Sequence, residues 1–221
     1  VTDLGRSAAK FKDLHLSGTA CVGTSVGIGT SDPSTYGVDG AEDLVIGQAD
    51  GNHGLTISSF GSSNGTIAFS DQTNVTVGRG YLDYDHSVNA MTVGTNGAER
   101  MRIDSLGNLL VGTSDSTPEN NNAGSTADNG IALRADGSLA IARAFAPVAY
   151  LNRTGTDGTI TDFRKDGTIV GSIGNATGTL VVGSPDGSGS YLRFGSNNIN
   201  PTTSAGALRD AAIDLGKTGG R

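Results

Sequence analysis

The stretch TNGAERMRIDSLGN at residues 95–108 carries the pattern that decides the fold of this chain. The Asn-Gly pair at 96–97 and the Gly-Asn pair at 107–108 are residues that adopt the positive φ angles of tight turns. Between them, Met101 and Ile103 alternate with polar residues, which is the period of a strand with one buried face. The stretch therefore predicts a short strand between two tight turns.

The same pattern recurs along the chain. Other short alternating segments occur at residues 14–16, 55–57, 66–69, 75–77 and 168–170, and other turn pairs at 50–51, 64–65, 136–137, 166–167 and 186–187. The single helix candidate, residues 205–212, has a glycine inside it. We therefore predict an all-β chain with Gly-rich turns and little or no helix.

Glycine dominates the composition. The 221 residues include 35 glycines, only 5% aromatic residues and no tryptophan, whereas ordinary proteins contain roughly 7% glycine. Ordering a glycine costs more backbone entropy than ordering any other residue, and large side chains whose burial would offset that cost are scarce. We expect the chain to gain its buried surface from other copies of itself.

Composition also excludes several classes of function. The net charge of −7 and the lack of a Lys/Arg cluster argue against nucleic acid as a partner. No apolar run is long enough for a membrane span, because Arg143 and Pro147 interrupt the Ala-rich stretch around them. A single cysteine, Cys21, excludes an internal disulfide framework and a cysteine-based zinc site. No cofactor or metal is predicted.

The motifs as a set resemble modules of bacteriophage tail fibres, those of marine phages especially. Residues 95–108, the following VGT at 111–113 and the preceding YDHSVNAM at 84–91 are similar to a module common in these fibres. The segments at 150–153, 162–167 and 171–174, and AIDLG at 212–216, resemble the region ahead of a self-cleaving intramolecular chaperone of endosialidase-type tailspikes. The resemblance covers most of the chain and is weakest over residues 117–129.

The resemblance implies an elongated, intertwined homotrimer with triple β-helix and β-prism segments. Sparse apolar side chains would then form an axial core shared by three chains. We expect this trimer core to contain Ile57, Phe69, Met101, Ile103, Leu110, Ile169 and Val182.

Five segments follow from the same resemblance. A β segment with the DLG and FKDLHLSG motifs spans residues 1–30, a repeated fibre-shaft β module 31–115, and a loop or linker 116–130. A β segment of pre-chaperone type spans 131–200, and residues 201–221 lead into a C-terminal chaperone. Residues 3–10 (DLGRSAAK) match residues 214–221 (DLGKTGGR), but the continuation after the first copy is missing after the second. We therefore expect the parent protein to run on past Arg221.

The implied function is that of a structural tail-fibre segment that contributes to host attachment, without enzymatic activity. The implied partners are two further copies of the chain, other tail proteins and a host-cell surface glycan or protein receptor. The implied location is the virion tail, after synthesis in the host cytoplasm.

One group of residues is a candidate receptor-binding site: Tyr84, Asp85 and His86, with Tyr81 and Asp83 close by. Carboxylates and aromatic rings contact glycans, but the same residues also fit a strand with its polar face in solvent, which we favour. Asp83 and Asp85 would lie on one strand face as neighbours, a poor geometry for glycoside hydrolysis.

Two alternative functions remain open. The chain could be the non-catalytic part of a polysaccharide-degrading tailspike whose enzyme lies before Val1. It could also belong to a bacterial trimeric surface adhesin, although the heptad repeats typical of adhesin stalks are absent from the sequence.

Overall fold

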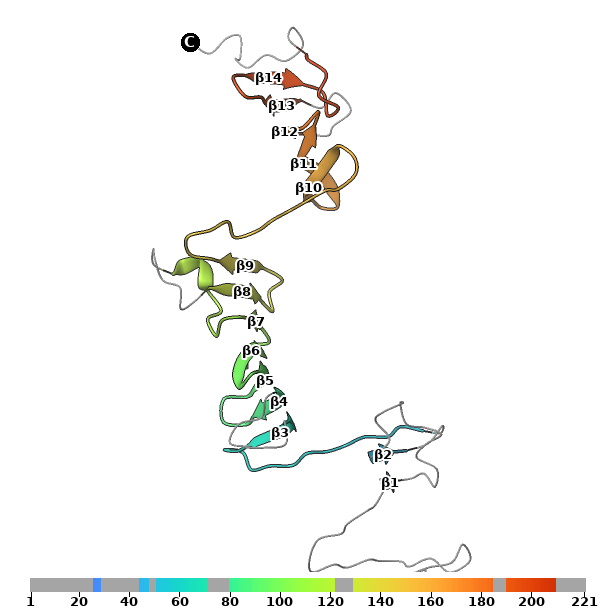
Figure 1. Cartoon of the computed structure of the whole chain (residues 1–221), viewed down its shortest axis with the longest axis vertical. Helices are drawn as coiled ribbons and strands as arrows, with labels where there is room; N and C mark the ends of the chain where they lie inside the picture. Colours follow the sequence, from blue (N-terminus) through green and yellow to red (C-terminus); the bar gives the residue numbers. More distant parts are fainter. Residues whose placement is uncertain are drawn as a thin grey trace, which may run out of the picture. The chain divides into compact units, whose positions relative to one another are not determined.

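The computed structural model describes residues 26–28, 44–47, 51–70, 80–121, 129–184 and 190–209 (Figure 1). The predicted strands at 14–16 and 75–77, the turn pair at 186–187 and Cys21 lie outside these residues. By compactness the chain divides into two units, residues 1–116 with 132–139, and residues 117–131 with 140–221. The five predicted segments stay a prediction.

The described chain is all-β, as predicted, with one 3-10 turn, η1 (Pro118–Asn120), as its helical element. The strands are β1 (Val26–Ile28), β2 (Leu44–Ile46), β3 (Asn64–Phe69), β4 (Gly80–Asp85), β5 (Ala90–Thr95), β6 (Ala98–Ile103), β7 (Leu109–Val111), β8 (Gly130–Leu133), β9 (Leu139–Ala142), β10 (Gly158–Lys165), β11 (Thr168–Ala176), β12 (Thr179–Gly183), β13 (Tyr191–Phe194) and β14 (Ile199–Thr202). They form a parallel pair, β1–β2, and two larger sheets.

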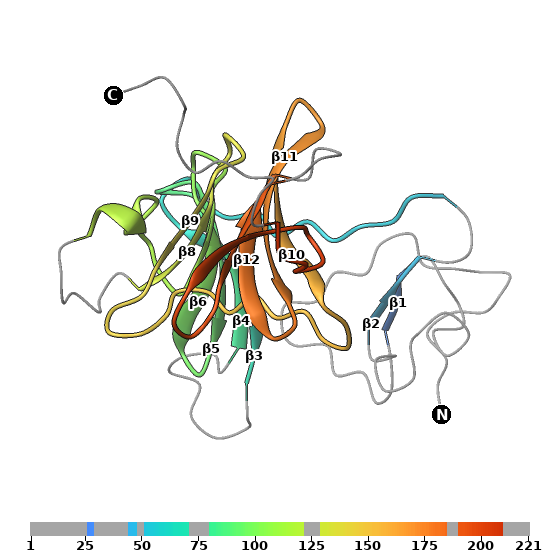
Figure 2. The ribbon, with the colours of Figure 1, turned by 90° about the horizontal axis from the view of Figure 1, so that it is seen from above.

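Each larger sheet is a meander in which strand order equals chain order. The first sheet runs from β3 to β9 and the second from β10 to β14, as the labels in Figure 1 show. Seen from above, the strands of the first sheet fan out with the usual sheet twist (Figure 2). The closest packing between described elements joins neighbouring strands of one sheet. Both sheets are single layers.

Several hairpin turns follow the prediction closely. Thr95 pairs with Ala98 across Asn96-Gly97, and Lys165 pairs with Thr168 across the turn at 166–167. In both turns the two central residues have φ angles between 50° and 80°, the type I′ geometry that suits hairpins. Glycine at the second position adopts this conformation without the clash that a Cβ would cause.

Within the described ranges, a second kind of turn occurs three times, between β6 and β7, between β8 and β9, and after β14. In each, the first residue donates its N–H to the carbonyl of the fifth at 2.9–3.0 Å, and the fourth, a glycine, donates back to the first. The first residues are Asp104, Arg134 and Thr203. The predicted turns at 107–108 and 136–137 belong to this kind.

Two local predictions were wrong. The pair Asn64-Gly65 is part of β3 and not a turn, and residues 55–57 lie outside any strand although they alternate. Ile57 instead packs beside Gly65, where an added Cβ would lie 3.4 Å from its Cγ2. The segment at 55–57 thus lies beside β3 without pairing with it. Alternation of apolar and polar residues does not distinguish such a segment from a true strand.

Cross-strand pairs of an aromatic residue and a glycine occur in both sheets: Phe69 with Gly80, Tyr84 with Gly65, Tyr81 with Gly94, Phe163 with Gly171, and Tyr191 with Gly183. A Cβ on Gly94 would lie 2.1 Å from ring atoms of Tyr81, so that ring occupies the space above the glycine. Aromatic rings placed over strand glycines restore packing that a glycine alone cannot provide.

Little of the described chain is buried within itself. Besides Pro118 of η1, eight hydrophobic residues are buried, namely Val45, Ala90, Leu110, Ala132, Ala140, Ala176, Val181 and Tyr191. Four of these are alanines, whose burial contributes little to the hydrophobic stabilisation of the fold. Most of the large apolar side chains are instead exposed on the sheets and on the segments that connect them.

Candidate functional site

The first sheet has one apolar and one polar face, which the strand register defines. Opposed residues of an antiparallel sheet share a face, and one row across β3 to β7 consists of Ile67, Leu82, Val93, Met101 and Val111. The next row on this face consists of Gly65, Tyr84, Met91, Ile103 and Leu109. We call this the apolar face of the first sheet.

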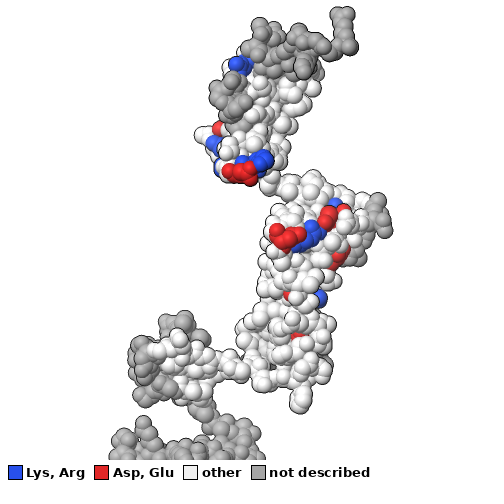
Figure 3. Space-filling view, turned by 180° about the vertical axis from the view of Figure 1, so that it is seen from behind, with Lys and Arg blue, Asp and Glu red and all other residues white. Residues whose placement is uncertain are grey.

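The polar face carries the row Thr66, Asp83, Thr92, Arg102 and Leu110. Asp83 accepts hydrogen bonds from Asn64 at 2.7 Å and from the Thr66 hydroxyl. Arg102 donates two hydrogen bonds to Glu99, at 2.5 and 2.6 Å, and these bonds raise the pKa of Arg102. These charged groups therefore find their hydrogen-bond partners locally, and Arg102 and Glu99 also form an ion pair. Figure 3 shows small mixed groups of acidic and basic side chains on an otherwise uncharged surface.

The candidate receptor residues are divided between these two faces. Tyr84 lies on the apolar face, opposite Gly65 and Met91, whereas Asp85 lies on the polar face, opposite Asn64 and Ala90. Asp83 and Asp85 share the polar face, as alternation predicts. They are neighbours along one strand and do not face each other across a cleft, as the two acids of a glycosidase must.

Asp85 organises the hairpin between β4 and β5. Its Oδ1 accepts hydrogen bonds from the hydroxyl of Ser87 at 2.6 Å and from the Ser87 backbone N–H at 2.8 Å. The Ser87 hydroxyl is the main cause of a lowered pKa of Asp85, and the backbone N–H adds to it. A carboxylate used in this way fixes the turn.

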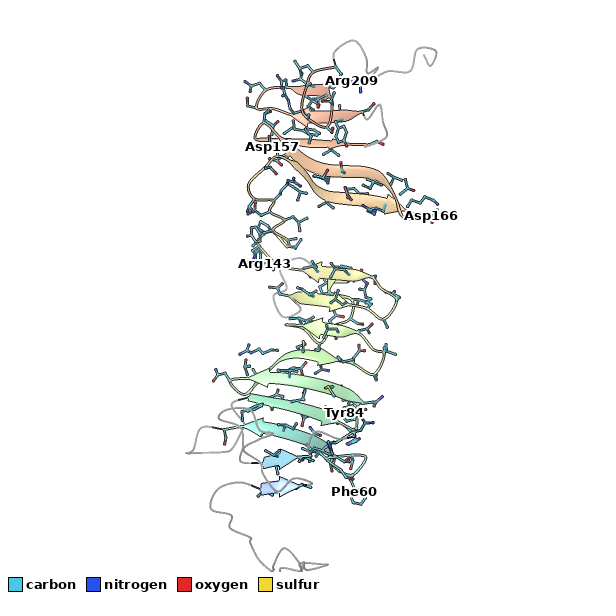
Figure 4. All side chains as sticks on the ribbon, turned by 90° about the vertical axis from the view of Figure 1, so that its right-hand side faces the viewer. Phe60, Tyr84, Arg143, Asp157, Asp166 and Arg209 are labelled. Carbon is cyan, nitrogen blue, oxygen red and sulfur yellow. The ribbon has the colours of Figure 1, made fainter. Side chains whose placement is uncertain are left out.

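Tyr84 and His86 form an aromatic pair on the apolar side. Their ring centroids are 4.9 Å apart with an interplanar angle of 76°, an edge-to-face contact, and the Tyr84 hydroxyl donates to Asn89 Oδ1. The pair lies at the edge of a depression of about 250 Å³ whose other walls are mostly aliphatic. Tyr84 lies near the strand ends, on the side where Phe60 also lies (Figure 4). The depression therefore offers an aliphatic surface with few hydrogen-bonding groups.

The candidate core residues of the first sheet occupy different positions. Phe69 is 65% exposed, and Ile57 and Ile103 are both 44% exposed, while Met101 is half-buried in the row described above. Leu110 lies at the end of the polar row and is 1% exposed, so its side chain is already covered within one chain. The first four belong to the exposed apolar side of the sheet, and Leu110 does not.

The second sheet repeats the division into two faces. One row on its apolar face consists of Ile173, Val182, Leu192 and Pro201. The next row on the same face consists of Asn175, Leu180, Phe194 and Ile199. Val182 is 37% and Phe194 40% exposed there, and Ile169, near the β10–β11 hairpin, is half-buried. The opposite face, which we call the covered face, has the row Ser172, Gly183, Tyr191 and Thr202, three of them buried side chains.

The sequence analysis missed the aromatic–glycine pairs and the buried group around Tyr191. Ala176, Val181 and Tyr191 form a small cluster on the covered face. A tyrosine opposite a glycine is visible only once the register is known, because the two residues lie on different strands separated by loops of unequal length. No local sequence signal reports that register.

Compared with protein-family models, with curated proteins and with solved structures, the chain matches none of them. In the described residues, no helix is both long and apolar enough to cross a lipid bilayer. This part of the chain also brings together no group of three His, Cys, Asp or Glu side chains that could hold a metal ion.

Proposed function

We propose that this chain is a shaft segment of a homotrimeric bacteriophage tail fibre that contributes to host attachment. One observation carries the proposal: each of two single-layer sheets exposes a face of large apolar side chains. The row from Ile67 to Val111 spans five strands, and the rows through Val182 and Phe194 span four. Contiguous apolar surfaces of this kind mark sites of association.

Copies of the same chain are the partners that fit these faces best. Three single-layer sheets arranged around an axis close a prism whose inner walls are their apolar faces, and every copy contributes the same residues. The polar face, with Asp83 and the Arg102–Glu99 ion pair, would then point to solvent. This arrangement corresponds to the β-prism segments that the resemblance of residues 84–113 to fibre modules implies.

The alternatives fit less well. A catalytic tailspike domain needs apposed acids, and Asp83 and Asp85 are neighbours on one strand. The non-catalytic part of such a tailspike would form the same trimer as a fibre shaft. An enzyme domain upstream in the same protein would distinguish the tailspike from the fibre. A bacterial adhesin stalk would need coiled-coil segments, for which the sequence has no heptads. We propose no catalytic role for this segment.

The test is the mass of the purified chain in solution, measured by light scattering coupled to gel filtration. We expect about three times the chain mass of 22.2 kDa. A stable, compact monomer would overturn the proposal. A trimer that competes with intact phage for adsorption to host cells would support the attachment role, and one that does not compete would restrict the segment to a structural role.

A further inference from the structure

The covered face of the second sheet contains a pocket of about 410 Å³, within the range of small-molecule sites. Its floor includes Ser172, Val181 and Tyr191, which the register places on the covered face. Asp157 and Gly158 form one wall, and Ser204 and Ala205 form another. The pocket is therefore built by strands at its base and by two connecting segments at its sides.

The wall at Asp157 is held in a fixed geometry. Asp157 Oδ1 accepts a hydrogen bond from Asn175 Nδ2, and its Oδ2 accepts one from the Thr177 N–H, both at 2.6 Å. The Gly158 N–H donates to Asn175 Oδ1 at 3.1 Å, which sets the orientation of the amide. Asp157 lies at the end of the β10–β11 pair away from the hairpin tip marked by Asp166 (Figure 4). Each carboxylate oxygen can still accept a second hydrogen bond.

The opposite wall is the turn of residues 203–207. Arg193 Nη1 donates to the Gly206 carbonyl at 3.2 Å, and a Cβ on Gly206 would lie 3.0 Å from the Cβ of Ala176. The turn is thus anchored to the sheet, and it brings Ser204 to the lip of the pocket. Both walls are preformed, which reduces the entropy lost when a ligand binds.

Two buried hydroxyl groups lie at the floor. Ser172 is 3% and Tyr191 5% exposed, and their hydroxyl oxygens are 3.4 Å apart, a long hydrogen bond. Each hydroxyl can donate one hydrogen bond and accept two, so this contact uses little of their capacity. A ligand that offers both donors and acceptors would satisfy them better than an apolar one.

From this arrangement we infer that the pocket binds a neutral saccharide ring. Hydroxyl groups and one carboxylate suit a polyhydroxylated ligand. The lining contains Asp157 and no Lys or Arg, so it offers no cationic group of its own to pair with an anionic ligand. The pocket opens on the face opposite Val182 and Phe194. Its accessibility in the assembled fibre rests on the proposed function, in which the apolar face lies on the trimer axis.

The experiment uses saturation-transfer NMR on the intact 221-residue chain with glucose, galactose, N-acetylglucosamine and glucuronate as probes. We expect millimolar binding of at least one neutral sugar and markedly weaker binding of glucuronate. Tyr191→Phe and Ser172→Ala should each weaken the neutral sugar about five-fold, the effect of losing one hydrogen bond. Tyr81→Phe is the matched control, because it removes the same hydroxyl from the tyrosine paired with Gly94 in the first sheet.

No neutral sugar binding at about 50 mM, equal binding of glucuronate, or affinity unchanged in both pocket variants would each overturn the inference. Ser172→Ala keeps the test decisive if Tyr191→Phe loosens the sheet, which amide hydrogen exchange would reveal. Light scattering on the same samples separates the two proposals. A monomer that binds sugar would overturn only the trimer, and a trimer that binds none would overturn only the saccharide site.

Discussion

In the first sheet the space above Gly94 is filled by the ring of Tyr81, which is half-exposed. In the second sheet the space above Gly183 is filled mainly by backbone, since a Cβ there would lie 2.3 Å from the Ser190 carbonyl oxygen and 2.6 Å from Tyr191 Cα. Both pairs are a tyrosine opposite a glycine, but only Tyr191 is buried and lines a polar pocket. The same cross-strand pair thus gives different surfaces, depending on the connecting segment that covers it.

The largest expected effect comes from truncating one residue on each face of the first sheet. Leu110→Ala should destabilise the chain itself by about 3 kcal/mol, because it leaves a cavity in a fully covered position. Ile103→Ala removes a side chain that is 44% exposed in one chain, so it should leave the sheet folded and reduce the yield of trimer. Circular dichroism and light scattering on both variants make the comparison. Normal trimer assembly by Ile103→Ala would mean that the apolar face is not on the trimer axis.

The two glycines provide the next comparison. Gly183→Ala should cost about 3 kcal/mol, because the added methyl group meets backbone atoms that cannot move without breaking the pairing of β12 with β13. Gly94→Ala should cost about 1 kcal/mol, since the ring of Tyr81 can rotate away into solvent. Hydrogen exchange followed strand by strand would assign each loss to its sheet. Equal losses would contradict the distinction between ring and backbone contacts.

A smaller effect concerns the acids that hold hairpin turns in the first sheet. Hydrogen bonds from the hydroxyl and then the N–H of Ser87 lower the pKa of Asp85, and those of Ser138 do the same for Asp136. A carboxyl group with a lowered folded-state pKa stabilises the fold above its unfolded pKa, and this contribution is lost as pH falls through the folded value. Both groups should therefore titrate below 3.8 in carboxyl-detected NMR.

The corresponding controls are Ser87→Ala and Ser138→Ala, which should return each pKa toward its ordinary value. An Asp85 pKa that does not respond to loss of the Ser87 hydroxyl would show that this hydrogen bond does not organise the turn.

The smallest expected effect is that of His86→Ala. His86 is exposed and contacts Tyr84 by its edge, so the change should alter the free energy of unfolding by no more than about 0.5 kcal/mol. Host adsorption of the assembled trimer should remain nearly intact. A well-assembled variant that no longer adsorbs would instead make the Tyr84–His86 pair a receptor contact.

Local chemistry explains which parts of the fold could be predicted from the sequence. The strands at 66–69, 101–103 and 168–170 and the turns at 96–97 and 166–167 follow from alternation and positive-φ residues, which act within a few positions. The position of Leu110 could not be predicted in this way. Leu109, Leu110 and Val111 are three consecutive apolar residues without alternation, and the face of each depends on its register with β6.

The candidate sites show the same limit. Tyr84, Asp85 and His86 are adjacent in sequence, but the pleat sends Tyr84 and Asp85 to opposite faces. The saccharide pocket combines residues from 157 to 205, which only the pairing of β10 to β14 and the turn at 203–207 bring together. Sequence patterns do not encode this pairing.

The meander topology has a consequence for the order of events during synthesis. Every strand from β3 to β14 that lies inside a sheet pairs with the strands before and after it in the chain, so each new strand finds its partner already made. Sequence-local pairing of this kind favours fast folding. Each sheet can therefore form on a single chain as it leaves the ribosome. The encounter of copies then becomes the slow, concentration-dependent step, during which the apolar faces are open to misassociation.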